Sequence, residues 1–276
     1  SCIYAYFLIN QALMVSIVFP GQGSQFIGMA KDFYDNFKIA RETFEEIEDY
    51  CEYNLKNIIF ENEGDKLNIT NYTQISIFTA SLMIFKTFVD ERKFDMSKVK
   101  CMMGHSLGEY SALMFAKSIT FEDAIKITHL RGKLMQSSEE GKMMAILGLD
   151  SKIIDEVCSQ INESNKNAYV ASANYNSLKQ TVIAGNNEGI EIASNLLPGI
   201  GAKRCIELNV SIASHTKLMT DAAEEFNESL RKIVFSSPSY PIIQNHTGEI
   251  ETDLSSIKQN LLNQLTKPVL WTKTMK

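Results

Sequence analysis

Short apolar runs and longer amphipathic stretches alternate along the first half of this chain. Residues 15–19 and 98–103 are mostly apolar and have the length expected of buried strands. Residues 109–117 form a helix-like stretch after the second run, residues 73–89 predict a strongly apolar central helix, and residues 121–140 carry an apolar stripe at helical spacing. Strands that alternate with helices predict a mainly parallel α/β sheet.

The rhythm changes in the middle of the chain. Strand-like runs occupy residues 143–149, 168–173, 180–184 and 203–210, helical stretches occupy residues 152–162 and 188–197, and residues 174–177 form a turn. This βαββαβ order is that of a ferredoxin-like unit. We therefore expect a small ferredoxin-like domain at residues 141–205, inserted into a larger domain made of residues 15–140 and 206–276, with residues 1–14 as an N-terminal extension.

Composition narrows the class of protein. A content of 45% hydrophobic and 22% charged residues is typical of a soluble globular protein. The net charge of −6 argues against a nucleic-acid-binding protein, although a local basic patch for an acidic partner stays possible. The five cysteines are scattered without metal-ligand spacing, which predicts reduced thiols in a cytoplasmic protein and no metal.

The first residues do not resemble a targeting or membrane segment. Residues 1–14 are too short to span a bilayer and lack the basic start and cleavage site of a signal peptide. Met14 directly precedes the first strand-like run. We expect Met14 to be the true start of the protein and no membrane association.

The sequence Gly104-His105-Ser106-Leu107-Gly108 carries the strongest chemical signal. A G-x-S-x-G between a strand and a helix is typical of a nucleophile elbow, in which a sharp turn exposes the serine hydroxyl. Ser106 is therefore the candidate nucleophile. The alternative is a glycine-rich loop whose serine only caps the following helix.

A serine hydroxyl needs a base, and the chain offers four histidines. His105 adjoins the nucleophile and should point away, His129 lies on a polar helix stripe, and His246 lies in a predicted surface turn. His215 follows a strand and precedes an amphipathic helix, where functional loops of α/β proteins gather. We predict His215 as the base, with a helix-start role as the alternative.

Acyl transfer by this pair also requires a group that orients the histidine and donors that stabilise the oxyanion. No acidic residue stands out to orient the histidine, so an oxygen near Asn245 or Gln264 is expected to do so, giving a Ser–His dyad. An oxyanion needs N–H donors, for which Leu107 and Gln22 in the glycine-rich loop 20–25 are the candidates. The same loop fails as a dinucleotide-binding fingerprint, because the next glycine lies too far along.

Arg131 interrupts the apolar stripe of its helix. An inward guanidinium must be paired, because burying an unpaired charge is costly. Its planar fork suits a carboxylate, either that of a substrate such as a malonyl group or that of an internal Asp or Glu. A substrate carboxylate would favour an acyltransferase over a plain esterase.

Five segments occur together and in order: FPGQGSQ at residues 19–25, GHSLGEYSAL at 104–113, LRGKLMQ at 130–136, SIASH at 211–215 and QLTKPVLW at 264–271. In these segments the chain from about Val15 onward resembles the malonyl-CoA:acyl carrier protein transacylases, and also the acyltransferase domains of polyketide synthases. The resemblance implies an α/β-hydrolase-like large domain with a ferredoxin-like small domain.

The resemblance also implies roles. Ser106 would carry the malonyl ester, His215 would be its base and Arg131 would hold the malonyl carboxylate. The backbone N–H groups of Gln22 and Leu107 would form the oxyanion hole, and the main-chain oxygen of Gln264 would orient His215. The implied reaction is a ping-pong transfer from malonyl-CoA to the phosphopantetheine thiol of acyl carrier protein for fatty-acid synthesis, without a cofactor.

Further expectations concern partners and extent. Acyl carrier protein is acidic, so Lys203, Arg204 and Lys217 are the candidates for a docking patch on a monomeric enzyme, in the cytoplasm or in an organelle with bacterial-type fatty-acid synthesis. The family pattern continues beyond the PVLW segment, so the resemblance implies a truncated C-terminus. An esterase or thioesterase, and a non-catalytic docking scaffold, are the alternatives.

Overall fold

The computed structural model describes residues 14–276, and the prediction for residues 1–13 lies outside this range. The larger sheet has the order β1-β2-β7-β8, in which β1 and β2 and then β2 and β7 pair in parallel and β8 is antiparallel. Its strands are β1 (Val15–Phe19), β2 (Val99–Gly104), β7 (Ile242–Ile243) and β8 (Ile250–Glu251). The parallel pairing predicted from strand–helix alternation is confirmed, although β7 is only two residues long.

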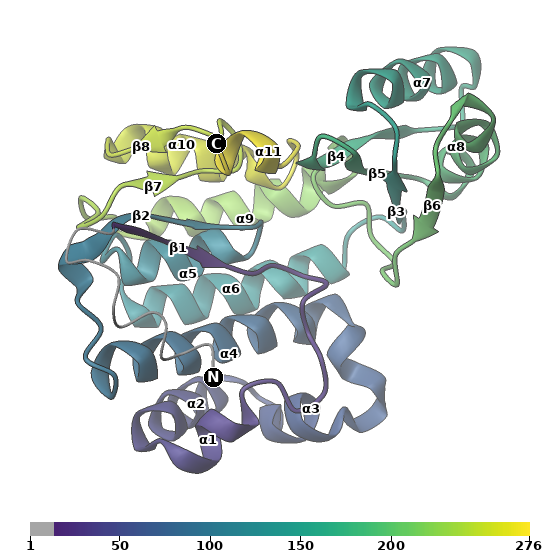
Figure 1. Ribbon diagram of the computed structural model, residues 1–276. Helices are drawn as coiled ribbons and strands as arrows, with labels where there is room; N and C mark the ends of the chain where they lie inside the picture. Colours follow the sequence, from purple (N-terminus) through teal and green to yellow (C-terminus); the bar gives the residue numbers. More distant parts are fainter. Residues whose placement is uncertain (1–13) are drawn as a thin grey trace.

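Helices surround this sheet on both sides (Figure 1). They are α1 (Lys31–Asn36), α2 (Lys38–Tyr50), α3 (Leu55–Glu61), α4 (Thr70–Asp90), α5 (Gly108–Phe115), α6 (Phe121–Gln136), α9 (Thr220–Lys232), α10 (Leu254–Gln264) and α11 (Trp271–Thr274). Short 3-10 turns are η2 (Glu63–Asn68), η3 (Met96–Lys98) and η4 (Lys217–Met219). Helix α4 packs against both α2 and α6 and is buried along most of its length, as expected of a central helix.

The second sheet protrudes at one end of the molecule, at the upper right of Figure 1. It contains β3 (Lys142–Leu147), β4 (Val170–Ser177), β5 (Gln180–Gly185) and β6 (Arg204–Glu207), with helices α7 (Ser151–Ser164) and α8 (Asn187–Ile200). The order β4-β5-β3-β6, antiparallel throughout, is the ferredoxin-like arrangement. This sheet and its helices enclose an apolar cluster separate from the core of the larger sheet. Other residues of the sheet form a small cluster with Ala213, which follows the sheet in the chain.

The predicted turn at residues 174–177 is wrong. These residues belong to β4, and the chain reverses at Leu178 and Lys179 before Gln180 pairs with Ser177. Two register irregularities in β4 break the period-two pattern that would have identified a strand. The Asn-rich composition of this segment therefore reflects an irregular strand rather than a turn.

Three glycines permit the backbone to close around the turn after β2. A Cβ on Gly104 would lie 1.9 Å from the backbone carbon of Gly108, and a Cβ on Gly108 would lie 2.3 Å from the carbonyl oxygen of Phe19. A Cβ on Gly21, in the loop after β1, would lie 2.3 Å from the carbonyl oxygen of His105. The glycine spacing of both sequence motifs thus follows from backbone-to-backbone contact, which no larger residue allows.

We predict that Gly104→Ala destabilises the protein by about 3 kcal/mol or more, because the new methyl group meets rigid backbone instead of a movable side chain. Urea unfolding followed by circular dichroism measures the change. Gly199→Ala is the matched control, since its Cβ would meet nothing within 4 Å and alanine favours the surrounding helix. Equal stability of Gly104→Ala and the parent protein would contradict this account of the turn.

Candidate active site

Ser106 occupies the turn between β2 and α5 in a left-handed backbone conformation, with φ of 52°. This conformation is uncommon for a residue with a side chain, and it persists where the surroundings enforce it. The Ser106 N–H donates to Asn245 Oδ1 at 2.6 Å, and Asn245 Nδ2 donates to the Gly104 carbonyl at 2.7 Å. The Asn245 side chain therefore clamps both ends of the turn, and the strand–turn–helix form expected of a nucleophile elbow is present.

His215 contacts Ser106 directly. Its Nε2 lies 2.8 Å from Ser106 Oγ, and its Nδ1 lies 2.8 Å from the main-chain oxygen of Gln264. With the proton on Nδ1 donated to that carbonyl, Nε2 is the acceptor that a serine proton requires. Of the two positions predicted for the orienting oxygen, Gln264 is the one observed, because the Asn245 side chain is engaged by the elbow.

The electrostatic surroundings keep His215 neutral. His215 is 3% exposed, and burial together with the charge of Arg131 lowers the pKa of His215 to about 3. A histidine with a lowered pKa retains its free acceptor nitrogen throughout the neutral range. Ser106 and His215 thus form a pair whose contact allows proton transfer from oxygen to a neutral acceptor nitrogen.

Arg131 lies at the same point, fully buried on α6. Its Nη2 donates to Ser106 Oγ at 3.0 Å and to Gln264 Oε1 at 3.0 Å, while Nη1 donates to Gln74 Oε1. No carboxylate within residues 14–276 forms an ion pair with it. A buried cation whose hydrogen-bond acceptors are all neutral oxygens, and which lies over the Tyr110 ring, is suited to receive the carboxylate of a ligand.

A close helix crossing brings Arg131 to its partners. A Cβ on Gly132 would lie 3.0 Å from both the Asn71 carbonyl and the Gln74 Cβ, so this glycine lets α6 approach α4. Gln74 Nε2 in turn donates to Gln22 Oε1 at 2.8 Å, and Gln22 Nε2 donates to Thr70 Oγ1 at 3.1 Å. The amide chain links Arg131 to the loop after β1.

The two candidate oxyanion donors flank the elbow. Gln22 adjoins Gly21, whose backbone packs against His105, and Leu107 directly follows Ser106. Within residues 14–276, no protein group accepts a hydrogen bond from the backbone N–H of Gln22 or of Leu107. Both donors are thus free for a ligand oxygen.

The other histidines lie outside this cluster. His105 Nε2 lies 2.9 Å from Asn176 Oδ1 and its ring packs against Trp271, so it bridges to the smaller sheet as a structural residue. His129, which the sequence places on a polar helix stripe, is half-buried, and its ring packs against Tyr50 and Tyr53. His246 is half-buried beyond β7.

Sequence reasoning missed two side chains of the site, Glu109 and Gln74. Glu109 is 1% exposed and accepts hydrogen bonds from Gln264 Nε2 and from the Asn245 N–H. A glutamate in the first turn of a helix is normally explained by its favourable interaction with the helix dipole, so the sequence alone did not indicate this role. Gln74 lies on an almost uniformly apolar helix, where an isolated buried amide is itself the available signal.

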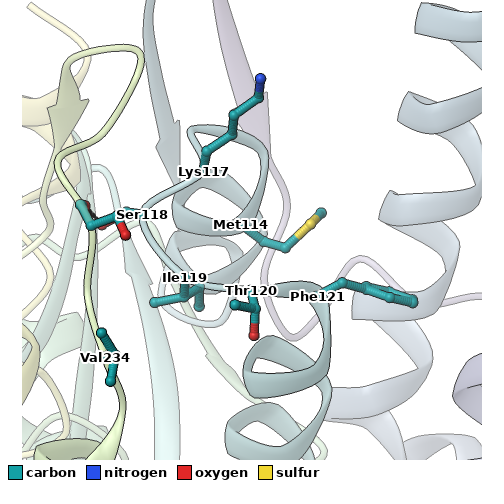
Figure 2. A pocket seen from close by; sticks show the side chains of 8 residues that line it. Met114, Lys117, Ser118, Ile119, Thr120, Phe121 and Val234 are labelled. Atoms are coloured by element: carbon teal, nitrogen blue, oxygen red, sulfur yellow. Dashed lines mark hydrogen bonds between the residues drawn. The ribbon is translucent and has the colours of Figure 1, made fainter.

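A separate hollow lies between the α5–α6 connection and the segment after α9, and Figure 2 shows Lys117, Phe121 and Val234 around it. None of its lining residues belongs to the Ser106 cluster. No helix among residues 14–276 combines the length and apolar character needed to cross a membrane.

Comparisons with known proteins identify the family. Residues 17–276 match the family described as acyl transferase domain. A malonyl CoA-acyl carrier protein transacylase of Haemophilus influenzae is 40% identical over 263 residues, covering 94% of this chain and 83% of the relative. The enzyme of the same name from Bacillus subtilis strain 168 is 37% identical, covering 92% of this chain and 80% of the relative.

Solved structures extend the agreement to the fold. The crystal structure of FabD from Acinetobacter baumannii has a TM-score of 0.88 and 39% identity, covering 94% of this chain and 82% of that one. A malonyl-transacylase in complex with a type II polyketide acyl carrier protein has a TM-score of 0.88 and 38% identity, covering 95% and 84%. The fold is the α/β-hydrolase-like domain with a ferredoxin-like one, and the chain belongs to the malonyl CoA-acyl carrier protein transacylase family of acyl transferases.

We predict that the His215 ring stays neutral far below the ordinary histidine pKa, because burial and Arg131 disfavour its cationic form. NMR titration of the ring resonances, assigned by comparison with His215→Gln, measures this. The ring nitrogen resonances of His215 should not reach imidazolium values as the pH falls through 6.5, the ordinary pKa of a histidine. A normal titration at that pH would contradict the electrostatic account.

Proposed function

We propose that this protein transfers a malonyl group from malonyl-CoA to the phosphopantetheine thiol of acyl carrier protein through an ester on Ser106. One observation carries the proposal: Ser106 Oγ lies 2.8 Å from His215 Nε2 and 3.0 Å from Arg131 Nη2. A nucleophile, its base and a cation for the substrate carboxylate therefore meet at one atom. The names of the relatives support the same substrates.

In the first half-reaction His215 takes the Ser106 proton on Nε2 while Oγ attacks the thioester carbonyl of malonyl-CoA. The Gln264 carbonyl stabilises the imidazolium through Nδ1–H. The N–H groups of Gln22 and Leu107 stabilise the oxyanion. Collapse of this tetrahedral intermediate breaks the carbon–sulfur bond, and His215 gives the proton that it took from Ser106 to the departing CoA sulfur.

The second half-reaction runs the same steps in reverse order. His215 deprotonates the phosphopantetheine thiol, whose sulfur attacks the Ser106 ester, and the proton then returns to Ser106 Oγ. None of these reaction steps uses a cofactor or a metal ion.

The exposed cations Lys203, Arg204 and Lys217 remain our proposed contacts for the acidic acyl carrier protein. Of these, Lys217 lies over the Tyr169 ring.

Arg131 selects the acyl group in this proposal. Its guanidinium donates to the oxygens of Gln74 and Gln264, which a malonyl carboxylate would replace as the acceptors. An acetyl group offers no such oxygens. The carboxylate therefore gains a charge-assisted interaction that uncharged acyl groups cannot make.

Mass spectrometry of the intact protein after brief mixing with malonyl-CoA tests the function. We expect a single malonyl adduct on the parent protein, none on Ser106→Ala, and rapid discharge on addition of holo acyl carrier protein. Discharge by water at the same rate would favour a thioesterase. Absence of an adduct on the parent protein would contradict the proposal.

We predict that Arg131→Ala lowers kcat/KM for malonyl-CoA relative to acetyl-CoA at least about tenfold, because a charge-assisted hydrogen bond is worth roughly 1.5–3 kcal/mol. Steady-state transfer assays with the two thioesters measure the ratio. Lys133→Ala, an exposed cation on the same helix, is the matched control and should leave the ratio unchanged. An unchanged ratio in Arg131→Ala would show that the guanidinium does not select the acyl group.

A further inference from the structure

The buried carboxylate of Glu109 has no role in the reaction described above. It lies in the first turn of α5, and its side chain contacts two other segments of the site. Oε1 accepts from the Asn245 N–H at 3.2 Å, after β7, and Oε2 accepts from Gln264 Nε2, at the end of α10. One side chain thus joins three segments that are far apart in the sequence.

The hydrogen-bond donors around Glu109 determine whether its ionised or its protonated form fits the site. Gln264 Nε2 donates to the Ser106 carbonyl at 3.0 Å, and Gln264 Oε1 accepts from Arg131 Nη2. The Gln264 amide therefore presents its NH₂ group to Glu109. Both Glu109 oxygens therefore face N–H donors. An ionised carboxylate, which only accepts, satisfies both, whereas a protonated carboxyl or an amide brings a donor against a donor.

The residues that Glu109 contacts each hold a reacting group. Gln264 presents its main-chain oxygen to His215 Nδ1 at 2.8 Å, and Asn245 accepts from the Ser106 N–H at 2.6 Å. We propose that Glu109 is a positioning residue whose ionised carboxylate fixes Gln264 and Asn245, and through them the orientations of His215 and Ser106. The identity of the acyl donor rests on the proposed function. The contacts that carry the inference are those that hold Ser106 and His215, whatever the acyl donor is.

The charges around Glu109 define a pH dependence. Its charged or titratable neighbours are Arg131 on α6, whose charge favours the carboxylate, and Tyr110 on its own helix, while Asn245, Gln244 and Gln264 are neutral. Burial outweighs these contacts and raises the pKa of Glu109 to about 7. Since the ionised form is the one that fits, Ser106 acylation should rise with pH through this value. His215, whose pKa is lowered, does not produce a step there.

The test measures single-turnover modification of Ser106 by rapid-quench mass spectrometry at pH values on both sides of 7, with malonyl-CoA and, separately, with the neutral reagent phenylmethylsulfonyl fluoride. We expect Glu109→Gln to slow both reactions roughly tenfold or more above the step, because a buried donor is left facing a donor. We also expect it to abolish the rise with pH. Unchanged rates, or an unchanged step, in Glu109→Gln would overturn the proposal.

Two further variants separate positioning from folding. Gln264→Met keeps the main-chain oxygen but removes an N–H that lowers the pKa of Glu109, so the step should move to higher pH. An unmoved step would contradict the proposal even if Glu109→Gln fails to fold. Asp155→Asn is the matched carboxylate-to-amide control, since Asp155 accepts from the Tyr175 and Ser172 hydroxyls in the smaller sheet. It should keep the parent rate and step.

The two reagents distinguish failure of this proposal from failure of the proposed function. A parent protein that reacts with the sulfonyl fluoride with a step near 7, but not with malonyl-CoA, would retain the role of Glu109 and reject the malonyl substrate. A parent protein that reacts with malonyl-CoA without any step would retain the substrate and reject the role of Glu109.

Discussion

Contact between backbone segments at the turn after β2 is the constraint on which the rest of this site depends. Gly104, Gly108 and Gly21 remove the Cβ atoms that would otherwise separate β1, β2 and α5. The turn between them forces Ser106 into a left-handed conformation, and the Asn245 side chain holds its two ends. A nucleophile presented this way needs no further movement to meet its base, so orientation is established by folding.

Burial is the largest cause of the shifted pKa values in this cluster, and a single buried cation acts on both of them. Arg131 contributes to the lowered pKa of His215 and opposes the rise in the pKa of Glu109. Its own charge is compensated by amide and hydroxyl oxygens instead of an ion pair, which leaves the guanidinium available to a substrate carboxylate. In the proposed reaction, substrate selection and the protonation state of the base would therefore both depend on this one side chain.

Much of this arrangement is readable from the sequence, because it is local. The glycine spacing around Ser106, the position of Arg131 in an apolar stripe and the βαββαβ order of the smaller sheet are short-range patterns. The partners of Glu109 are different in kind, since Gln264 lies 155 residues away and Asn245 lies 136 residues away. Only the register of α10 and β7 against the elbow reveals these contacts, and no local periodicity encodes that register. Irregular pairing likewise concealed the end of β4.

The most direct measurement of the central claim is a crystal structure of the protein after reaction with malonyl-CoA and rapid freezing. The account predicts an ester on Ser106 Oγ, its carbonyl oxygen facing the N–H groups of Gln22 and Leu107, and the malonyl carboxylate on the Arg131 guanidinium. An unmodified Ser106 beside bound malonyl-CoA, or an ester whose carboxylate points away from Arg131, would contradict it.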